Sequence, residues 1–132
     1  MIEAYLHRLD ALLSASPLVR DVEIVRRSIR DTEFERVLHY RYRVLLTNGD
    51  FVEMTERILE ARGTLEVTKY RHHWQDRHGR LLKRWDNAPH YPAIDTFPHY
   101  LRDGAEDQVV RHPATTGLEA LQDILEEAEA QE

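Results

Sequence analysis

Hydrophobic positions recur with a helical period at both ends of the chain. Near the N-terminus their spacing predicts a helix over residues 2–13, which Ser14-Ala15-Ser16-Pro17 ends. Near the C-terminus an apolar stripe predicts a helix over residues 116–130, with Thr116 and Glu119 spaced as a capping box. Each helix therefore has one apolar face that must pack against another layer of the fold.

Between these helices the hydrophobic period changes to two, which is typical of half-buried strands. The Asn48-Gly49 pair is suited to a two-residue type I′ hairpin, which would place Leu46 opposite Phe51 and Arg41 opposite Glu56. The predicted strands are Val22–Ile29, Phe34–Leu46, Phe51–Glu60, Thr64–Trp74 and Arg80–Asp86. The pattern thus predicts an antiparallel meander sheet of about five strands across residues 22–86.

Residues 87–113 show neither period and carry four of the five prolines. Because proline interrupts regular elements, this segment is predicted to be a long loop rich in proline and histidine. Long loops in compact domains are often functional. With its 132 residues, the chain is expected to form a single α+β domain over residues 1–132, a sheet with an N-terminal and a C-terminal helix.

Composition narrows the classes of function. The absence of cysteine excludes disulfides, thiolate metal sites and cysteine nucleophiles. The net charge of −6 comes from the six acidic residues after Leu118, so no basic field covers the whole chain, although arginine outnumbers lysine 16 to 2 and suits phosphate. Without a signal-peptide pattern or an apolar run of membrane length, a cytoplasmic location without membrane association is expected.

The candidate chemistry lies in a histidine-rich stretch. Strand alternation places His72 and His73 on opposite faces of the sheet, and the next strand returns beside them. The loop is expected to carry His90 and His99 over the end of the sheet. Six of the eight histidines fall here: His72, His73, His78, His90, His99 and His112. The remaining two, His7 and His39, are isolated and are assigned no role.

The first chemistry that suits this stretch is metal-independent RNA cleavage without a cofactor. Histidine exchanges protons near neutral pH, so His72 or His73 is a candidate base and His90 or His99 a candidate acid. Arg71 is the candidate phosphate clamp, since arginine stabilises a charged phosphorane. The candidate substrate-binding residues are Tyr70, Trp74, Lys83, Arg84, Asp86 and Asn87.

Two alternatives remain open. The stretch is also compatible with a metal site built from histidines and Asp86, although its spacing is no recognised ligand pattern. It is equally compatible with a non-catalytic interaction module that docks a protein partner. Simpler structural roles compete as well: Trp74 and Trp85 as core residues, Tyr70 as a packed strand aromatic, and Asp86-Asn87 as a turn.

Three runs in this stretch resemble the TumE-like family, whose members are the toxin halves of bacterial and archaeal toxin–antitoxin pairs. The runs are Tyr70-Arg71-His72-His73-Trp74-Gln75, Trp85-Asp86-Asn87-Ala88-Pro89-His90 and Phe97-Pro98-His99-Tyr100, within a resemblance that covers roughly residues 20–113. One departure is that Tyr91 and Tyr100 stand where a second histidine is expected. The family-like positions are Tyr70, Arg71, His72, His73, Trp74, Asp86, Asn87, His90, Phe97 and His99.

The resemblance implies a toxin whose partner is an antitoxin of the helix-turn-helix type. By analogy with RelE-like toxins, which are small α+β proteins with a central antiparallel sheet, it implies an endoribonuclease directed at RNA or the ribosome. The oligomeric state is left open, and a homodimer is compatible with the resemblance.

Overall fold

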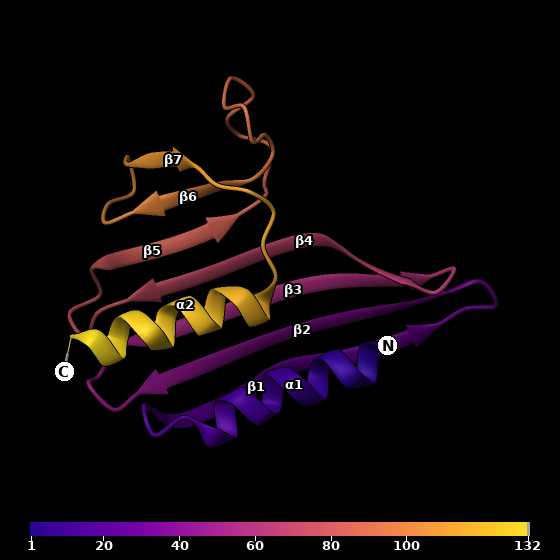
Figure 1. Ribbon diagram of the computed structural model, residues 1–132, viewed down its shortest axis with the longest axis horizontal. Helices are drawn as coiled ribbons and strands as arrows, with labels where there is room; N and C mark the ends of the chain where they lie inside the picture. Colours follow the sequence, from indigo (N-terminus) through magenta and orange to yellow (C-terminus); the bar gives the residue numbers. More distant parts are fainter. Residues whose placement is uncertain (132) are drawn as a thin grey trace.

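The structure, a computed structural model, describes residues 1–131 as one antiparallel sheet with two helices (Figure 1). The helices are α1 (Ile2–Ala15) and α2 (Gly117–Ala130). The strands are β1 (Val19–Asp31), β2 (Glu35–Leu46), β3 (Phe51–Ala61), β4 (Thr64–Gln75), β5 (Leu81–Asp86), β6 (Tyr100–Asp103) and β7 (Val109–Arg111). Their order in the sheet follows the sequence from β1 to β7. The predicted meander with terminal helices is confirmed, with seven strands in the described chain in place of about five.

The two additional strands, β6 and β7, lie within the segment predicted to be one long loop. The prolines gather before residue 99 and at Pro113, so the residues between them are free to form a short hairpin. That hairpin extends the sheet, because Leu101 pairs with Trp85 and Val110 with Leu101. The irregular part of the loop is therefore confined to residues 87–99.

The β2–β3 hairpin differs from the predicted register by one residue. The Leu46 amide donates to the Asp50 carbonyl at 2.9 Å, so three residues form the loop. Only Gly49 has positive φ (92°), as in three-residue hairpins, whereas a type I′ turn needs positive φ at Asn48 as well. The observed partners are Leu45 with Phe51, Tyr40 with Glu56, and Arg41 with Thr55.

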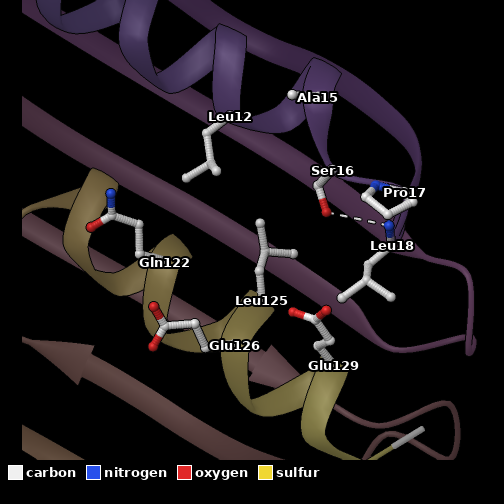
Figure 2. A pocket seen from close by; sticks show the side chains of 9 residues that line it. All are labelled: Leu12, Ala15, Ser16, Pro17, Leu18, Gln122, Leu125, Glu126 and Glu129. Carbon is white, nitrogen blue, oxygen red and sulfur yellow. Dashed lines mark hydrogen bonds between the residues drawn. The ribbon is translucent and has the colours of Figure 1, made fainter.

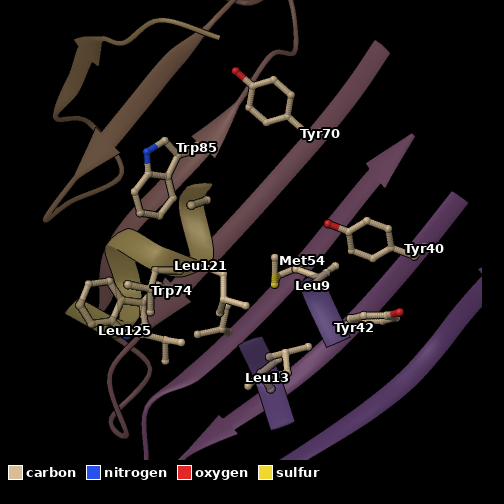
Figure 3. Close-up of a cluster of buried hydrophobic side chains, with 14 of the residues drawn as sticks. Leu9, Leu13, Tyr40, Tyr42, Met54, Tyr70, Trp74, Trp85, Leu121 and Leu125 are labelled. Atoms are coloured by element: carbon tan, nitrogen blue, oxygen red, sulfur yellow. The ribbon is translucent and has the colours of Figure 1, made fainter. Parts of the chain in front are cut away.

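Both helices cover the same face of the sheet (Figure 1). Alternate residues of β2, β3 and β4 point toward them and are buried, as the period of two requires. Figure 3 shows this core, in which Trp74 and Trp85 lie beside Leu121 and Leu125 of α2. The Trp74 indole N–H donates to Asp50 at 3.0 Å, so the one polar atom of that ring has a partner.

A buried carboxylate, that of Glu56 on β3, links this core to both helices. Its Oε1 accepts hydrogen bonds from the hydroxyls of Tyr5 (2.6 Å) and Tyr40 (2.7 Å), and its Oε2 accepts from the Gly117 amide (2.9 Å). Burial raises the pKa of Glu56 and opposes the lowering by these donors. The site has no room for a side chain at Gly117, since a Cβ there would lie 2.1 Å from the Tyr40 hydroxyl.

Candidate functional site

The face of the sheet opposite the helices is uncovered. Thr55 and Arg71 lie on the central strands β3 and β4, where a covered sheet would bury them, yet both are exposed. Their neighbours on this face are polar or charged along most of its length. We call this the open face of the sheet.

The open face is rich in cations, some of which are ion-paired. Arg41 and Arg43 bind Glu53, and Arg84 makes a bidentate pair with Glu106 at 2.9 and 3.0 Å. Others have no ion-pair partner among residues 1–131: Arg26, Arg57, Lys69 and Arg71. Although the protein is acidic overall, this face thus has an excess of positive charge.

Two adjoining hollows on the open face bring several of the predicted site residues together. The first, about 220 Å³, lies over β3–β5 and is lined by Arg71, His73 and Arg84. The second, about 310 Å³, lies beside the loop and is lined by Arg71, Arg84, Asp86 and His90. Arg71 and Arg84 line both hollows, which therefore adjoin, and we call the two together the depression, with His73 in the first hollow and His90 in the second.

His73 is held in one tautomer. Its Nδ1 accepts from the Arg84 guanidinium at 3.1 Å, and its Nε2 lies 2.8 Å from the Gln75 amide oxygen, so Nε2 carries the proton. Partial burial lowers the pKa of His73, and the charges of Arg84 and Arg71 lower it further. His73 is therefore neutral at physiological pH, the form in which a histidine accepts a proton.

The other predicted residues lie on the helix-covered side. His72 is fully buried, and neither ring nitrogen has a hydrogen-bond partner within the described chain; burial lowers the pKa of His72 to about 3. The Nδ1 of His99 lies at hydrogen-bond distance, 2.8 Å, from the Tyr70 hydroxyl, and the Tyr70 ring stacks on both His99 and His72. Lys83 pairs with Glu127 of α2. His72 and His99 are thus separated by the sheet from His73 and His90.

Asp86 and Asn87 anchor the start of the loop. The Asn87 side chain accepts from the Tyr70 amide at 3.0 Å and donates to the Thr68 carbonyl at 3.2 Å. Asp86 accepts from the Ala88 amide at 2.7 Å, in the pattern of an Asx turn. These bonds fix the direction in which the chain leaves β5, and so the position of His90.

The comparisons with known proteins decide the family. The sequence matches the family described as Toxin TumE over residues 9–132, nearly the whole chain. The chain belongs to the TumE toxin family. No curated protein and no solved structure matches it.

Membership of the TumE family makes the protein the toxin of a toxin–antitoxin system, with an antitoxin as its partner. The family-like stretch supplies the two central strands of the depression, but its residues divide between the two faces. In this TumE toxin Tyr91 and Tyr100 contact each other edge to face, with ring centroids 4.9 Å apart, and Arg102 lies over both rings. The two tyrosines thus attach the loop to β6.

The loop end of the depression holds polar residues that sequence reasoning missed. Lys69, Tyr100 and Arg102 line its loop end together with His90. Lys69 precedes Arg71 by two residues, so alternation alone would have placed it on the same face. Tyr100 and Arg102 reach the site because β6 pairs with β5, and that strand lay in the predicted loop.

A different hollow, about 330 Å³, lies on the helix side of this TumE toxin (Figure 2). Leu12, Leu18 and Leu125 supply apolar surface, and Glu126 and Glu129 of α2 supply an acidic rim. An acidic rim repels phosphate, so this groove does not suit RNA. It suits an apolar side chain flanked by basic residues.

Two further properties concern the described part of the TumE chain. Within residues 1–131, no three histidine, aspartate or glutamate side chains lie close enough together to hold a metal ion. Over the same residues, neither helix has the length and apolar character needed to cross a bilayer.

Proposed function

We propose that this TumE toxin is a metal-independent endoribonuclease and that its site is the depression on the open face. The observation that carries the proposal is that His73 and His90 lie in two adjoining hollows of the open face, both of which Arg71 lines. Arg71 is exposed and has no ion-pair partner among residues 1–131, so it is available for a phosphate. The three groups that RNA cleavage needs, a base, an acid and a cation, then lie on one surface.

In the proposed reaction, the RNA 2′-hydroxyl is the nucleophile. The hydroxyl oxygen bonds to the adjacent phosphorus while the Nδ1 of His73 takes the hydroxyl proton. To free Nδ1, the Arg84 guanidinium moves from His73 to the phosphate. The bond from phosphorus to the 5′-oxygen then breaks, and His90 donates a proton to that oxygen. The products are a 2′,3′-cyclic phosphate and a 5′-hydroxyl, and Arg71 stabilises the charge that builds on phosphorus oxygens between them.

The test is cleavage of single-stranded RNA by the purified toxin in the presence of a chelator. His73→Ala and His90→Ala are each expected to lower the initial rate by about 10²–10⁴-fold, the usual contribution of a positioned acid or base. Since the pKa of His73 lies below its usual value of 6.5, the loss of rate that follows protonation of this base should set in below that value.

The matched control is His78→Ala, which makes the same change at an exposed histidine in the β4–β5 turn. It is expected to leave the rate unchanged. Wild-type cleavage by the double variant His73→Ala/His90→Ala, with circular dichroism showing a folded protein, would rule out the assigned roles. Loss of wild-type cleavage in chelator would rule out a metal-independent reaction.

A second role, docking of the antitoxin, is supported by the groove of Figure 2. We infer that the antitoxin is of the helix-turn-helix type and inserts an apolar side chain of a basic amphipathic segment between α1 and α2. The acidic rim and apolar surface complement such a segment in charge and in hydrophobicity.

Charge reversal of the rim tests the docking role. Glu126→Lys/Glu129→Lys should weaken binding of the antitoxin by about tenfold or more, because it replaces attraction by repulsion at the rim. Asp123→Lys makes the same kind of change on α2 at a residue that does not line the groove. Titration calorimetry that gives the double variant and Asp123→Lys equal affinities would place the antitoxin elsewhere.

A further inference from the structure

A third hollow on the open face lies away from the proposed catalytic depression. It measures about 660 Å³ and spans β1 to β4, with His39 of β2 among its lining residues. Register places His39 opposite Arg57, and Arg57 opposite Lys69. We call this hollow the His39 basin.

The basin is strongly cationic. Arg26, Arg57 and Lys69 line it, and none has an ion-pair partner among residues 1–131. The only acidic residue in its lining is Glu56, whose carboxylate is bound on the other side of the sheet by Tyr5, Tyr40 and Gly117. Of the basin's cations, Arg41 is paired with Glu53, but no carboxylate of the described chain neutralises Arg26, Arg57 or Lys69.

Two side chains of the basin would be stabilised by a bound anion. Burial lowers the pKa of His39, and the charges of Arg26, Arg57 and Arg30 lower it further. Arg41, at the edge of the basin, has a buried Nε without a hydrogen-bond partner in the described chain. Both groups would gain from an anion in the basin.

The basin adjoins the catalytic depression. Lys69 lines the basin and also the hollow that holds His90. His39 lies two strands across and about four residues along from His73, a separation of roughly 16 Å from ordinary strand spacings. Such a distance requires a ligand longer than a single nucleotide to reach both.

We propose that the His39 basin binds the phosphodiester backbone of single-stranded RNA at a distance from the bond that is cleaved. That the bound polymer is RNA rests on the proposed function. That it is a polyanion rests on the charge of the basin alone. Apart from the small imidazole of His39, no aromatic ring among the lining residues faces the basin for a base to stack on, since the Tyr40 ring lies on the helix side. The basin therefore binds phosphates irrespective of sequence and favours a strand of several nucleotides over a short one.

The first experiment measures binding of a fluorescent 2′-O-methyl oligoribonucleotide of about ten nucleotides, which has no free 2′-hydroxyl and cannot be cleaved. Near physiological salt, Arg26→Gln/Arg57→Gln should weaken binding about tenfold, and above it reduce the slope of log affinity against log salt by about 1.4, for two lost phosphate contacts. Arg8→Gln, an exposed arginine of α1 that lies outside the basin, should change neither quantity.

The second experiment follows the His39 ring by NMR in the full-length toxin. Binding of the oligonucleotide should raise the pKa of His39, and it should do so equally in the His73→Ala variant, because the basin needs no catalysis. If the pKa of His39 rises on binding but the wild-type toxin cleaves no RNA, the proposed function is wrong and the basin is still a binding site for the oligonucleotide.

Three results would overturn the inference. One is an unchanged affinity and salt slope in Arg26→Gln/Arg57→Gln. Another is a response of His39 to inorganic phosphate as large as its response to the oligonucleotide, which would show a site for a small anion. The third is a response of His39 to the antitoxin alone, which would show a site for an acidic protein segment.

Discussion

Glu56→Ala is expected to lower the free energy of unfolding by about 4 kcal/mol. The substitution leaves the hydroxyls of Tyr5 and Tyr40 and the Gly117 amide without their common acceptor, and each unsatisfied buried group costs about 1–3 kcal/mol. These donors come from α1, β2 and α2, so the loss loosens both helices on the sheet. Urea denaturation followed by circular dichroism measures it.

Two companion variants define the origin of this loss. Glu56→Gln keeps an acceptor oxygen and should recover more than half of the stability. Glu53→Ala makes the same truncation three residues earlier on β3, on the open face, where its partners Arg41 and Arg43 are partly solvated; it should cost about 1 kcal/mol or less. Equal losses in Glu56→Ala and Glu53→Ala would refute a structural role for the buried network.

His72 is expected to make the fold sensitive to acid. Burial lowers the pKa of His72 to about 3 in the folded protein, against 6.5 in an unfolded chain. As the pH falls below 6.5, the unfolded chain therefore takes up a proton that the folded protein excludes, and stability is lost down to the folded pKa. The expected loss is about 1.4 kcal/mol per pH unit, or about 3 kcal/mol at pH 4.5.

His72→Phe isolates this contribution. The phenyl ring keeps the shape of the side chain but cannot be protonated, and no hydrogen bond is lost because neither nitrogen of His72 has a partner in the described chain. At pH 7.5 the variant should be about as stable as the wild type, and its advantage should grow as the pH falls. If the free energies of unfolding of the two proteins change in parallel with pH, His72 is not the source of the sensitivity to acid.

The raised pKa of Glu56 acts in the opposite direction. Its protonation in the fold contributes stability below its unfolded value of 4.5, and that contribution is lost as the pH rises through the raised folded pKa. Taking the difference in the free energy of unfolding between wild type and His72→Phe at each pH cancels this effect.

The same variant also bears on catalysis. If His72→Phe cleaves RNA at the wild-type rate, the catalytic base lies on the open face and is not His72.

The period of the strands was sufficient to predict which histidines separate. Alternation requires His72 and His73 to point apart, and the structure has one buried beneath the helices and the other on the open face. Alternation cannot say which face the helices cover. That depends on how the loops leave the sheet, and here both connections lead to the same side (Figure 1).

Register was harder to predict than alternation. A single φ angle at Asn48 distinguishes a two-residue from a three-residue hairpin, and Asn-Gly permits both. The shift moved Glu56 opposite Tyr40, the pair on which the buried network depends. His39 appeared isolated for a related reason: its neighbours Arg57 and Lys69 are distant in sequence and are brought together only by strand pairing.

The open face of the sheet and the helix α2 behind it carry opposite charge. Ionic strength therefore determines how strongly the charge of α2 acts on an RNA strand bound at the open face. The solvent-facing acidic side chains of α2 lie behind the open face by more than the diameter of a helix, about 10 Å. At physiological salt the Debye length is about 8 Å, so the carboxylates are screened and the strand encounters mainly arginine and lysine. In about 10 mM salt the Debye length reaches about 30 Å, and the net charge of −6 repels the same strand. Affinity for RNA should therefore pass through a maximum at intermediate salt, unlike that of a uniformly basic protein.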